Sequence, residues 1–183
     1  MVVRGGASGI SGPAYVHLPP EYFRPGHAKK SFPVSVVLTG YPGNAKSLIK
    51  VLKYPTTANR LTAQGKMQPM VLVMLRPTVA PPRDTECVDV PGGPQVETFL
   101  ARDLPEAVSG AYRVGEHARN WGVIGDSTGG HCALKLGLHH PDRFAASAGL
   151  SPYWRRRRRR HQRPLGQQHP HPDTYAVVGP VAA

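Results

Sequence analysis

One serine stands in a spacing that acyl-transfer chemistry uses. Gly125-Asp126-Ser127-Thr128-Gly129 has the pattern G-x-S-x-G, in which a strand turns sharply into a helix and presents the serine hydroxyl at the sheet edge. Gly125 and Gly129 permit this turn, which a bulkier residue would block. The spacing therefore predicts Ser127 as a nucleophile that lies beside the free N–H groups at the start of the helix.

The residues on either side of this motif supply the elements that it needs. Trp121–Ile124 is an apolar run that predicts a strand, and Cys132–Leu136 has a helix-like composition. This context favours a nucleophile over a glycine-rich turn in which Ser127 merely caps a helix. Chymotrypsin-like proteases carry a similar Gly-Asp-Ser triplet, but they place His and Asp ahead of the serine on a largely all-β scaffold. The alternation of strand and helix signals in this chain argues against that class.

Strand and helix signals alternate along the first 150 residues. The predicted strands are short apolar runs at residues 14–18, 34–39, 70–75, 121–124 and 145–150. The predicted helices cover residues 44–53, 56–65, 96–114 and the stretch from the serine motif to about residue 139. Asn44 and either Thr56 or Thr57 are the expected N-caps, and Pro105 is expected to start or kink a turn. The pattern predicts a three-layer α/β fold with helices on both faces of a mainly parallel sheet.

Length and composition point to one domain. The chain has 183 residues, which can bury a real core. Cys87 and Cys132 are too few for a disulfide scaffold, so both can be buried thiols, although a single bridge stays open. Residues 1–6 lack the apolar core of a signal peptide, and no run approaches the length of a membrane span. As written, the chain is expected to be cytoplasmic.

The positive charge is concentrated near the C-terminus. The formal net charge is +12, and Arg155–Arg160 with Arg163 supply seven of the cations. Beyond Trp154, glutamine, histidine and proline replace the apolar periodicity, a composition that favours disorder. We therefore expect a partial domain at residues 1–154 and a tail at 155–183. Arginine runs can bind polyanions non-specifically, while no specific nucleic-acid partner is expected.

Three stretches of the chain resemble one enzyme family. Residues 16–23, 38–44 and 125–152, the last with His-Pro-Asp-Arg-Phe and Gly-Leu-Ser-Pro segments, are similar to the esterase D branch of the α/β-hydrolase superfamily. That branch includes S-formylglutathione hydrolases, feruloyl-type esterases and secreted mycolyltransferases. The resemblance covers roughly residues 13–154 and implies the N-terminal portion of an α/β-hydrolase sheet.

The same resemblance assigns roles to individual residues. It implies that Ser127 forms a seryl acyl-enzyme with a small-molecule ester or thioester, without metal or cofactor. The backbone N–H groups of Thr128 and Tyr41 would then form the oxyanion hole, because two fixed donors stabilise the charge that develops on the carbonyl oxygen. For Tyr41, a packed loop aromatic is the alternative interpretation.

The chain departs from the family after the serine, where an acid and then a histidine should follow. The carboxylates there are Asp142, in a turn where a surface or capping role is expected, and Asp173, which follows every histidine. Three of the histidines, His161, His169 and His171, lie in the tail, and His131 and His139 lie on the helix after the serine, where a surface or core role is expected. Because members of a catalytic triad act as a unit, we expect very low activity from this chain.

The acidic segment ahead of the third predicted helix could suggest a metal site. It contains Asp84, Glu86, Cys87 and Asp89 within the proline-rich residues 76–94. Neither a histidine pair nor a metal-binding loop spacing supports such a site, so a solvated loop is expected there.

Two hypotheses explain the tail. Arginine codons of the CGN type read one nucleotide later become Ala or Asp codons, so residues 155–165 can be the out-of-frame product of an acidic, turn-like segment. The nucleotide sequence from Ser151 onward tests this hypothesis. The alternative is a catalytically inactive interaction protein whose basic tail binds polyanions.

Overall fold

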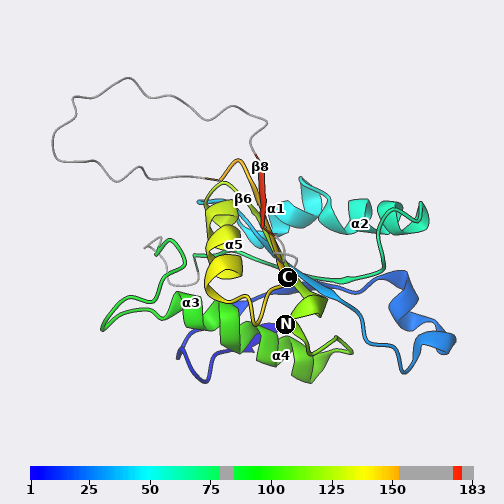
Figure 1. Ribbon diagram of the computed structural model, residues 1–183, viewed down its shortest axis with the longest axis horizontal. Helices are drawn as coiled ribbons and strands as arrows, with labels where there is room; N and C mark the ends of the chain where they lie inside the picture. Colours follow the sequence, from blue (N-terminus) through cyan, green and yellow to red (C-terminus); the bar gives the residue numbers. More distant parts are fainter. Residues whose placement is uncertain (79–84, 153–174, 179–183) are drawn as a thin grey trace, which may run out of the picture.

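The computed structural model describes residues 1–78 and 85–152, together with the backbone of residues 175–178. A six-stranded sheet runs through this part of the chain (Figure 1). Its order is β3 (Tyr15–His17), β5 (Val71–Leu75), β4 (Val34–Leu38), β6 (Trp121–Asp126), β7 (Ala146–Leu150) and β8 (Tyr175–Val178). The four central strands are parallel, and β3 and β8 pair antiparallel at the two edges.

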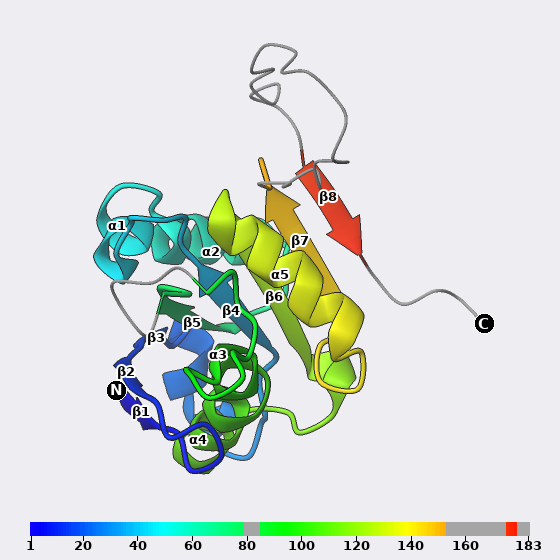
Figure 2. The same ribbon diagram turned by 90° about the vertical axis from the view of Figure 1, so that its left-hand side faces the viewer.

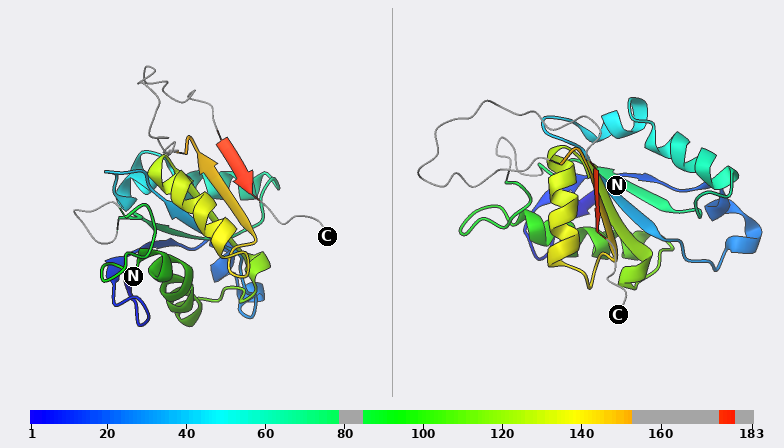
Figure 3. Two further views of the ribbon diagram at one scale, coloured as in Figure 1. Left: turned by 60° about the vertical axis from the view of Figure 1, so that its left-hand side comes forward. Right: turned by 45° about the horizontal axis from the view of Figure 1, so that its top comes forward.

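Helices cover both faces of this sheet, as the sequence predicts (Figure 3). One face carries α3 (Val96–Thr98), the π-helical turn η3 (Phe99–Asp103), α4 (Leu104–Ala111) and α5 (Thr128–His139). The other face carries α1 (Ala45–Lys50) and α2 (Tyr54–Ala63). We call these the α5 face and the α2 face. The predicted three-layer α/β architecture is thereby confirmed.

The two faces have separate apolar cores because strand side chains alternate in direction. Val36 and Leu38 of β4 pack on the α5 face in a large cluster that includes Phe99, Leu104 and Leu136. On the α2 face the buried cluster of the described residues is small. It consists of Val37, Leu48, Ala58, Leu72 and Met74.

A hairpin that the sequence analysis did not anticipate lies against the α5-face helices. It is formed by β1 (Val2–Arg4) and β2 (Ser11–Pro13). The carboxylate of Asp103 holds its turn, because it accepts hydrogen bonds from the Ala7 and Ser8 amides at 3.0 Å each and from the Ser8 hydroxyl at 2.5 Å. Burial raises the pKa of Asp103, but the hydrogen bonds outweigh it and hold the pKa below its usual value.

Two prolines refine the predicted helix boundaries. The predicted helix 56–65 begins too late, because α2 begins at Tyr54 and Pro55 lies in its first turn, where a missing N–H costs nothing. The expected N-caps Thr56 and Thr57 are therefore already helical. In the predicted helix 96–114, Pro105 occupies the first turn of α4, and the π-helical turn directly precedes it. A π turn avoids the clash of the proline ring with a carbonyl one turn earlier.

Three 3-10 turns complete the described elements between the strands. They are η1 (Pro20–Phe23), η2 (Pro25–His27) and η4 (Ala118–Asn120). Within the described residues, no helix is both long and apolar enough to span a membrane.

The sheet extends one strand beyond the last strand that the sequence predicts. β8 pairs antiparallel with β7, with Tyr175 opposite Leu150, and forms the edge of the sheet (Figure 2). The expected disordered tail begins at residue 155, so four of its residues form a strand instead. The arginine run Arg155–Arg160, the expected polyanion-binding segment, lies outside the described residues.

Cys87 and Cys132 form a disulfide, so the single bridge is present rather than two buried thiols. The bridge spans 45 positions of sequence, with the two Cα atoms 5.5 Å apart. It joins the segment ahead of α3 to the second turn of α5. The Lys135 ammonium, on the same helix, donates a hydrogen bond to the Glu86 carbonyl at 2.6 Å. The segment is therefore attached to the helix that follows Ser127.

Candidate active site

Ser127 occupies the junction between β6 and α5 in a conformation that few residues adopt. Its φ is 50° and its ψ is −119°, a backbone region that costs a non-glycine residue about 1–3 kcal/mol. Two backbone hydrogen bonds hold it there: its N–H donates to the Leu150 carbonyl at 2.9 Å, and its carbonyl accepts from the His131 N–H at 3.0 Å. The side chain is exposed. The turn thus presents the hydroxyl to solvent at the carboxyl end of the parallel strands.

The two motif glycines allow three elements to meet at this turn. A Cβ atom on Gly125 would lie 2.3 Å from the carbonyl carbon of Gly129, and one on Gly129 would lie 2.4 Å from the Leu38 carbonyl oxygen. Both distances are far below van der Waals contact. Glycine is therefore required where β6, α5 and the end of β4 meet, which is the physical reason for the G-x-S-x-G spacing.

The loop after β4 lies directly beside the serine. A Cβ atom on Gly40 would be 3.0 Å from the Cβ of Ser127, and Tyr41 is the next residue. Within the described residues, the N–H groups of Tyr41 and Thr128 donate no hydrogen bond. Tyr41 and Ser127 line one cavity of about 210 Å³. Both predicted donor amides are thus available beside the serine, and their role in an oxyanion hole stays a prediction. The Tyr41 side chain is half exposed, which does not fit a packed loop aromatic.

Asp126, the residue before the serine, connects the two loops. Its Oδ2 accepts a hydrogen bond from the Gly40 N–H at 3.2 Å. Its Oδ1 is buried and has no hydrogen-bond partner within the described residues. Burial raises the pKa of this carboxyl, and the hydrogen bond from Gly40 opposes the rise. Asp126 therefore positions the Gly40–Tyr41 loop through one oxygen, while the other is buried without a partner in the described part of the chain.

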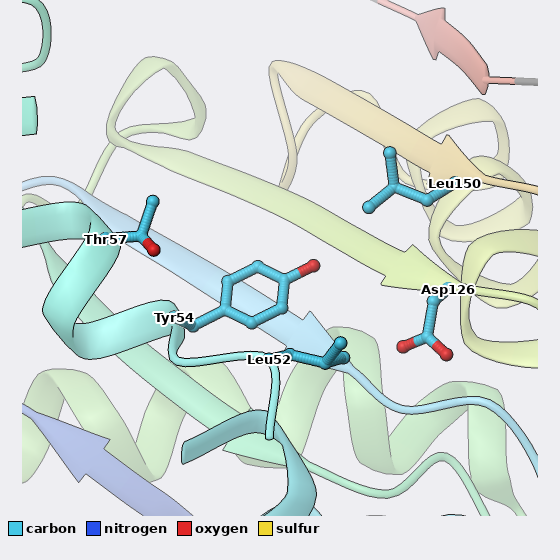
Figure 4. Close-up of a pocket in the computed structure, with 5 residues that line it drawn as sticks. All are labelled: Leu52, Tyr54, Thr57, Asp126 and Leu150. Atoms are coloured by element: carbon cyan, nitrogen blue, oxygen red, sulfur yellow. The ribbon is translucent and has the colours of Figure 1, made fainter. Parts of the chain in front are cut away.

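A second, larger cavity of about 310 Å³ begins at Asp126 on the α2 face (Figure 4). Its lining consists of Leu52, Tyr54, Thr57, Asp126 and Leu150. Burial raises the pKa of Tyr54, and the negative charge of Asp126 adds to this effect. Leu52 and Asp126 line both cavities. The cavity beside Ser127 and the cavity beside Tyr54 are therefore neighbours.

Three residues that follow the serine, His139, His140 and Asp142, have side-chain surroundings that do not include Ser127. Glu97 Oε1 lies 2.8 Å from His139 Nδ1 and 2.9 Å from His140 Nε2. Asp142 is exposed in the turn after α5, which agrees with its expected surface role. The tail histidines and Asp173 lie outside the described residues. No histidine base for Ser127 is therefore identified within the described part of the chain.

The acidic segment is occupied by structural contacts. Cys87 belongs to the disulfide. Asp89 accepts hydrogen bonds from the Thr98 amide at 3.0 Å and from the Thr98 hydroxyl at 2.6 Å. These contacts fix the start of the helical stretch from α3 to α4. Asp84 lies outside the described residues.

Sequence reasoning did not single out Asp126, Tyr54 or Gly40 as site residues. Asp126 stood inside the motif at a position where the pattern accepts any residue. Tyr54 lies 73 positions before the serine in the sequence, and no periodicity connects the two residues. The glycine that precedes Tyr41 was the one available signal for the contact between the two loops.

Comparison with known proteins agrees with this geometry. A family model described as "Putative esterase" matches residues 9–181. An uncharacterised protein of Corynebacterium glutamicum is 27% identical over 138 residues, which are 75% of this chain and 32% of that protein. The chain thus spans about a third of this curated relative.

Solved esterase structures share the fold. A ferulic acid esterase superposes with a TM-score of 0.69 at 22% identity, over 79% of this chain and 54% of that chain. An S-formylglutathione hydrolase from Agrobacterium tumefaciens superposes with a TM-score of 0.64 at 18% identity, over 83% of this chain and 56% of that chain. The chain spans about half the length of these structures. Because the family model matches most of the chain, the chain belongs to this esterase family, and the shared fold is consistent with the expected esterase D branch of the α/β-hydrolase superfamily.

Proposed function

We propose that this chain carries the nucleophile of a serine esterase or acyltransferase that acts on small-molecule esters or thioesters. The observation that carries the proposal is the backbone of Ser127, held at a φ of 50° between β6 and α5 with its side chain exposed. Family membership supports the reaction class. The similarity to feruloyl esterase and S-formylglutathione hydrolase structures supports the type of substrate.

The proposed chemistry follows from the atoms at the site. The Ser127 oxygen attacks the carbonyl carbon of the ester while a base accepts its proton, and the carbonyl oxygen becomes negatively charged. The N–H groups of Thr128 and Tyr41 stabilise this oxygen. Collapse of the tetrahedral intermediate releases the alcohol or thiol and leaves an acyl group on Ser127, which water or another acceptor then removes. No metal or cofactor takes part in these proposed reaction steps.

We further propose that turnover by the 183-residue chain is very low. The described residues include Ser127 and the two amides that we propose as donors, but they do not supply a positioned acid and histidine. Removal of one triad member typically leaves only the small rate that binding and the oxyanion hole provide. Rapid ester hydrolysis by the purified chain would contradict this proposal.

Covalent labelling tests the nucleophile separately from turnover. The full chain is incubated with a fluorophosphonate, and the modified residue is located by peptide mass spectrometry. We expect phosphonylation of Ser127, its loss in Ser127→Ala and its retention in Ser109→Ala. Ser109 is a matched control because it is an exposed serine on α4. Circular dichroism of each variant confirms folding, and a folded wild-type chain without a label on Ser127 would contradict the proposal.

A further inference from the structure

The part of the chain that forms the α2 face carries positive charge without neighbouring acids. Residues 22–83 contain ten Lys and Arg residues and no Asp or Glu. Residues 84–111, which lead into and form α3 and α4 on the opposite face, contain six Asp and Glu residues and one Arg. The two faces of the sheet therefore differ in charge as well as in packing, and the α2 face favours an anionic partner.

Three of these cations lie on α1 and on its connection to α2. Lys46 and Lys50 are helical residues of α1, and Lys53 directly precedes α2. All three side chains are exposed, and within the described residues none of them forms an ion pair. Like charges four positions apart on a helix repel each other. An anionic partner at this place would relieve the repulsion between Lys46 and Lys50.

The same connection exposes large apolar side chains. Val51 is 71% exposed, and Leu52, the next residue, is 47% exposed. Leu52 and the half-exposed Tyr41 line the cavity that contains Ser127. Figure 4 shows Leu52 near Asp126, the residue before the serine. We define the α1 surface by its three apolar and its three cationic residues, which are Tyr41, Val51, Leu52, Lys46, Lys50 and Lys53.

The combination of aliphatic and cationic side chains on the α1 surface selects one kind of partner. An anionic lipid bilayer offers phosphates to the lysines and an apolar boundary to the aliphatic side chains. A soluble polyanion such as nucleic acid would contact the lysines but leave Val51 and Leu52 in water. An apolar protein surface would cover Val51 and Leu52 but leave the three lysines without counter-charges.

We propose that the α1 surface docks on an anionic lipid bilayer, with Val51 and Leu52 entering the headgroup region and the three lysines contacting lipid phosphates. Because Tyr41 and Leu52 line the cavity of Ser127, a bilayer docked there would border that cavity. The proposal concerns the surface beside the serine and does not depend on the esterase chemistry. Fluorophosphonate labelling of Ser127 in solution therefore tests one proposal and vesicle binding tests the other.

Vesicle binding by the intact chain measures the contribution of the lysines. The chain is sedimented with vesicles of phosphatidylcholine alone and of phosphatidylcholine mixed with phosphatidylglycerol. The triple variant Lys46→Gln, Lys50→Gln, Lys53→Gln should bind the anionic vesicles roughly tenfold or more weakly than the wild-type chain. Each lysine near an anionic surface accounts for about fivefold in binding. Circular dichroism confirms that the variant folds.

The control variant removes the same charge at the opposite end of the sheet. It is Lys29→Gln, Lys30→Gln, Arg119→Gln, whose three exposed cations precede β4 and β6 and so lie toward the amino ends of the parallel strands. We expect the control to bind anionic vesicles within about threefold of the wild-type chain. Equal losses in the two triple variants would show that net charge, to which the arginine run contributes, drives binding. That result would overturn the proposal.

Tryptophan fluorescence tests whether the apolar side chains enter the bilayer. Val51→Trp is compared with Phe23→Trp, because Val51 and Phe23 are both 71% exposed and Phe23 lies on η1, away from the α1 surface. After subtraction of the wild-type emission, anionic vesicles should shift the emission to shorter wavelength for Val51→Trp alone. Equal shifts in both variants, or no shift at position 51, would overturn the proposal.

Two further outcomes identify a different occupant of the α1 surface. Emission of Val51→Trp that is already shifted without vesicles would show that a second copy or another part of the chain covers the surface. Binding of a single-stranded DNA oligomer that is lost in the lysine variant, without a vesicle-induced shift at position 51, would indicate a polyanion site. Either result would overturn the proposal of a lipid bilayer.

Discussion

The two faces of the central sheet differ in how completely they are packed. On the α5 face, the strands meet four helical segments, the disulfide and the β1–β2 hairpin around one large apolar cluster. On the α2 face, two helices cover a small cluster, and Val51, Leu52 and Leu150 are 71%, 47% and 40% exposed. The closely packed face is the one that contains the motif glycines, Gly125 and Gly129.

This difference indicates how the site divides its tasks. The α5 face fixes the backbone of Ser127, because Gly125 and Gly129 leave no space for movement where β6, α5 and β4 meet. The α2 face provides the open space next to that backbone, where a substrate can lie. Rigid support on one side and an accessible cavity on the other are what a positioned nucleophile needs.

The largest expected effect comes from a methyl group added inside the packed face. Gly129→Ala places its Cβ 2.4 Å from the Leu38 carbonyl oxygen and 2.5 Å from that of Thr39, so β4 and α5 must separate. We expect a loss of about 4 kcal/mol or more in the free energy of unfolding, measured by urea denaturation. The control is Gly110→Ala in α4, where no atom lies within 4 Å and a gain of about 0.5–1 kcal/mol is expected. Similar midpoints for the two variants would contradict the close packing.

Removal of the disulfide is expected to weaken the same face by a smaller amount. The double variant Cys87→Ala, Cys132→Ala opens a bridge that spans 45 positions, and the loss of loop constraint corresponds to about 2–4 kcal/mol. Urea denaturation with and without dithiothreitol measures it. The reductant should destabilise the wild-type chain and leave the variant unchanged. A wild-type midpoint that does not respond to complete reduction would show that the bridge adds no stability.

Asp103 is expected to make the packed face sensitive to acid. Asp103→Asn puts an amide donor against the Ser8 and Ala7 N–H groups, and we expect a loss of about 1–2 kcal/mol at pH 7. The pKa of Asp103 lies below its ordinary value of 3.8 in the folded chain. Its stabilisation is therefore present above pH 3.8 and disappears as the pH falls through the folded pKa.

The pH dependence separates this carboxylate from an ordinary surface charge. Urea midpoints between pH 7 and pH 2.5 should converge for the wild-type chain and Asp103→Asn. Glu106→Gln is the control, because its ion pair with Arg102 is exposed on both sides and should contribute less than about 0.5 kcal/mol. A constant difference between wild type and Asp103→Asn down to pH 2.5 would contradict the assignment.

The smallest effect on stability is expected on the open face. Leu52 is 47% exposed although it lines both cavities, so Leu52→Ala should change the free energy of unfolding by less than about 0.5 kcal/mol. A destabilisation of 2 kcal/mol or more would show that the α2 face is as closely packed as the α5 face.

The parts of the fold that the sequence predicts are those with local signals. Apolar runs identify β4, β5, β6 and β7, and the glycine spacing around Ser127 identifies the turn into α5. Their alternation is sufficient for the three-layer class, because a parallel sheet requires helical crossovers. The prediction of the nucleophile position therefore depends on information contained within about 20 residues.

The parts that the sequence does not predict depend on distant contacts or on weak local signals. The disulfide joins two cysteines whose separation follows no known scaffold, and the Tyr54 cavity joins residues from α2, β6 and β7. β8 follows a segment whose composition favours disorder, and its four residues carry too little pattern to outweigh that context. The predicted second helix starts at residue 56 rather than at Tyr54, because a proline breaks a helix in its interior but is well tolerated in a first turn, where Pro55 lies.

The bridge between Cys87 and Cys132 also bears on where in a cell this fold can persist. Disulfides endure in oxidising compartments and are rare where glutathione keeps thiols reduced. In a reducing cytoplasm the two sulfurs would separate, and the hydrogen bond between Lys135 and Glu86 would remain to attach the segment ahead of α3 to α5. The expectation of a cytoplasmic chain thus implies that the segment ahead of α3 is held less tightly against α5. An oxidising environment would keep the segment attached by the disulfide.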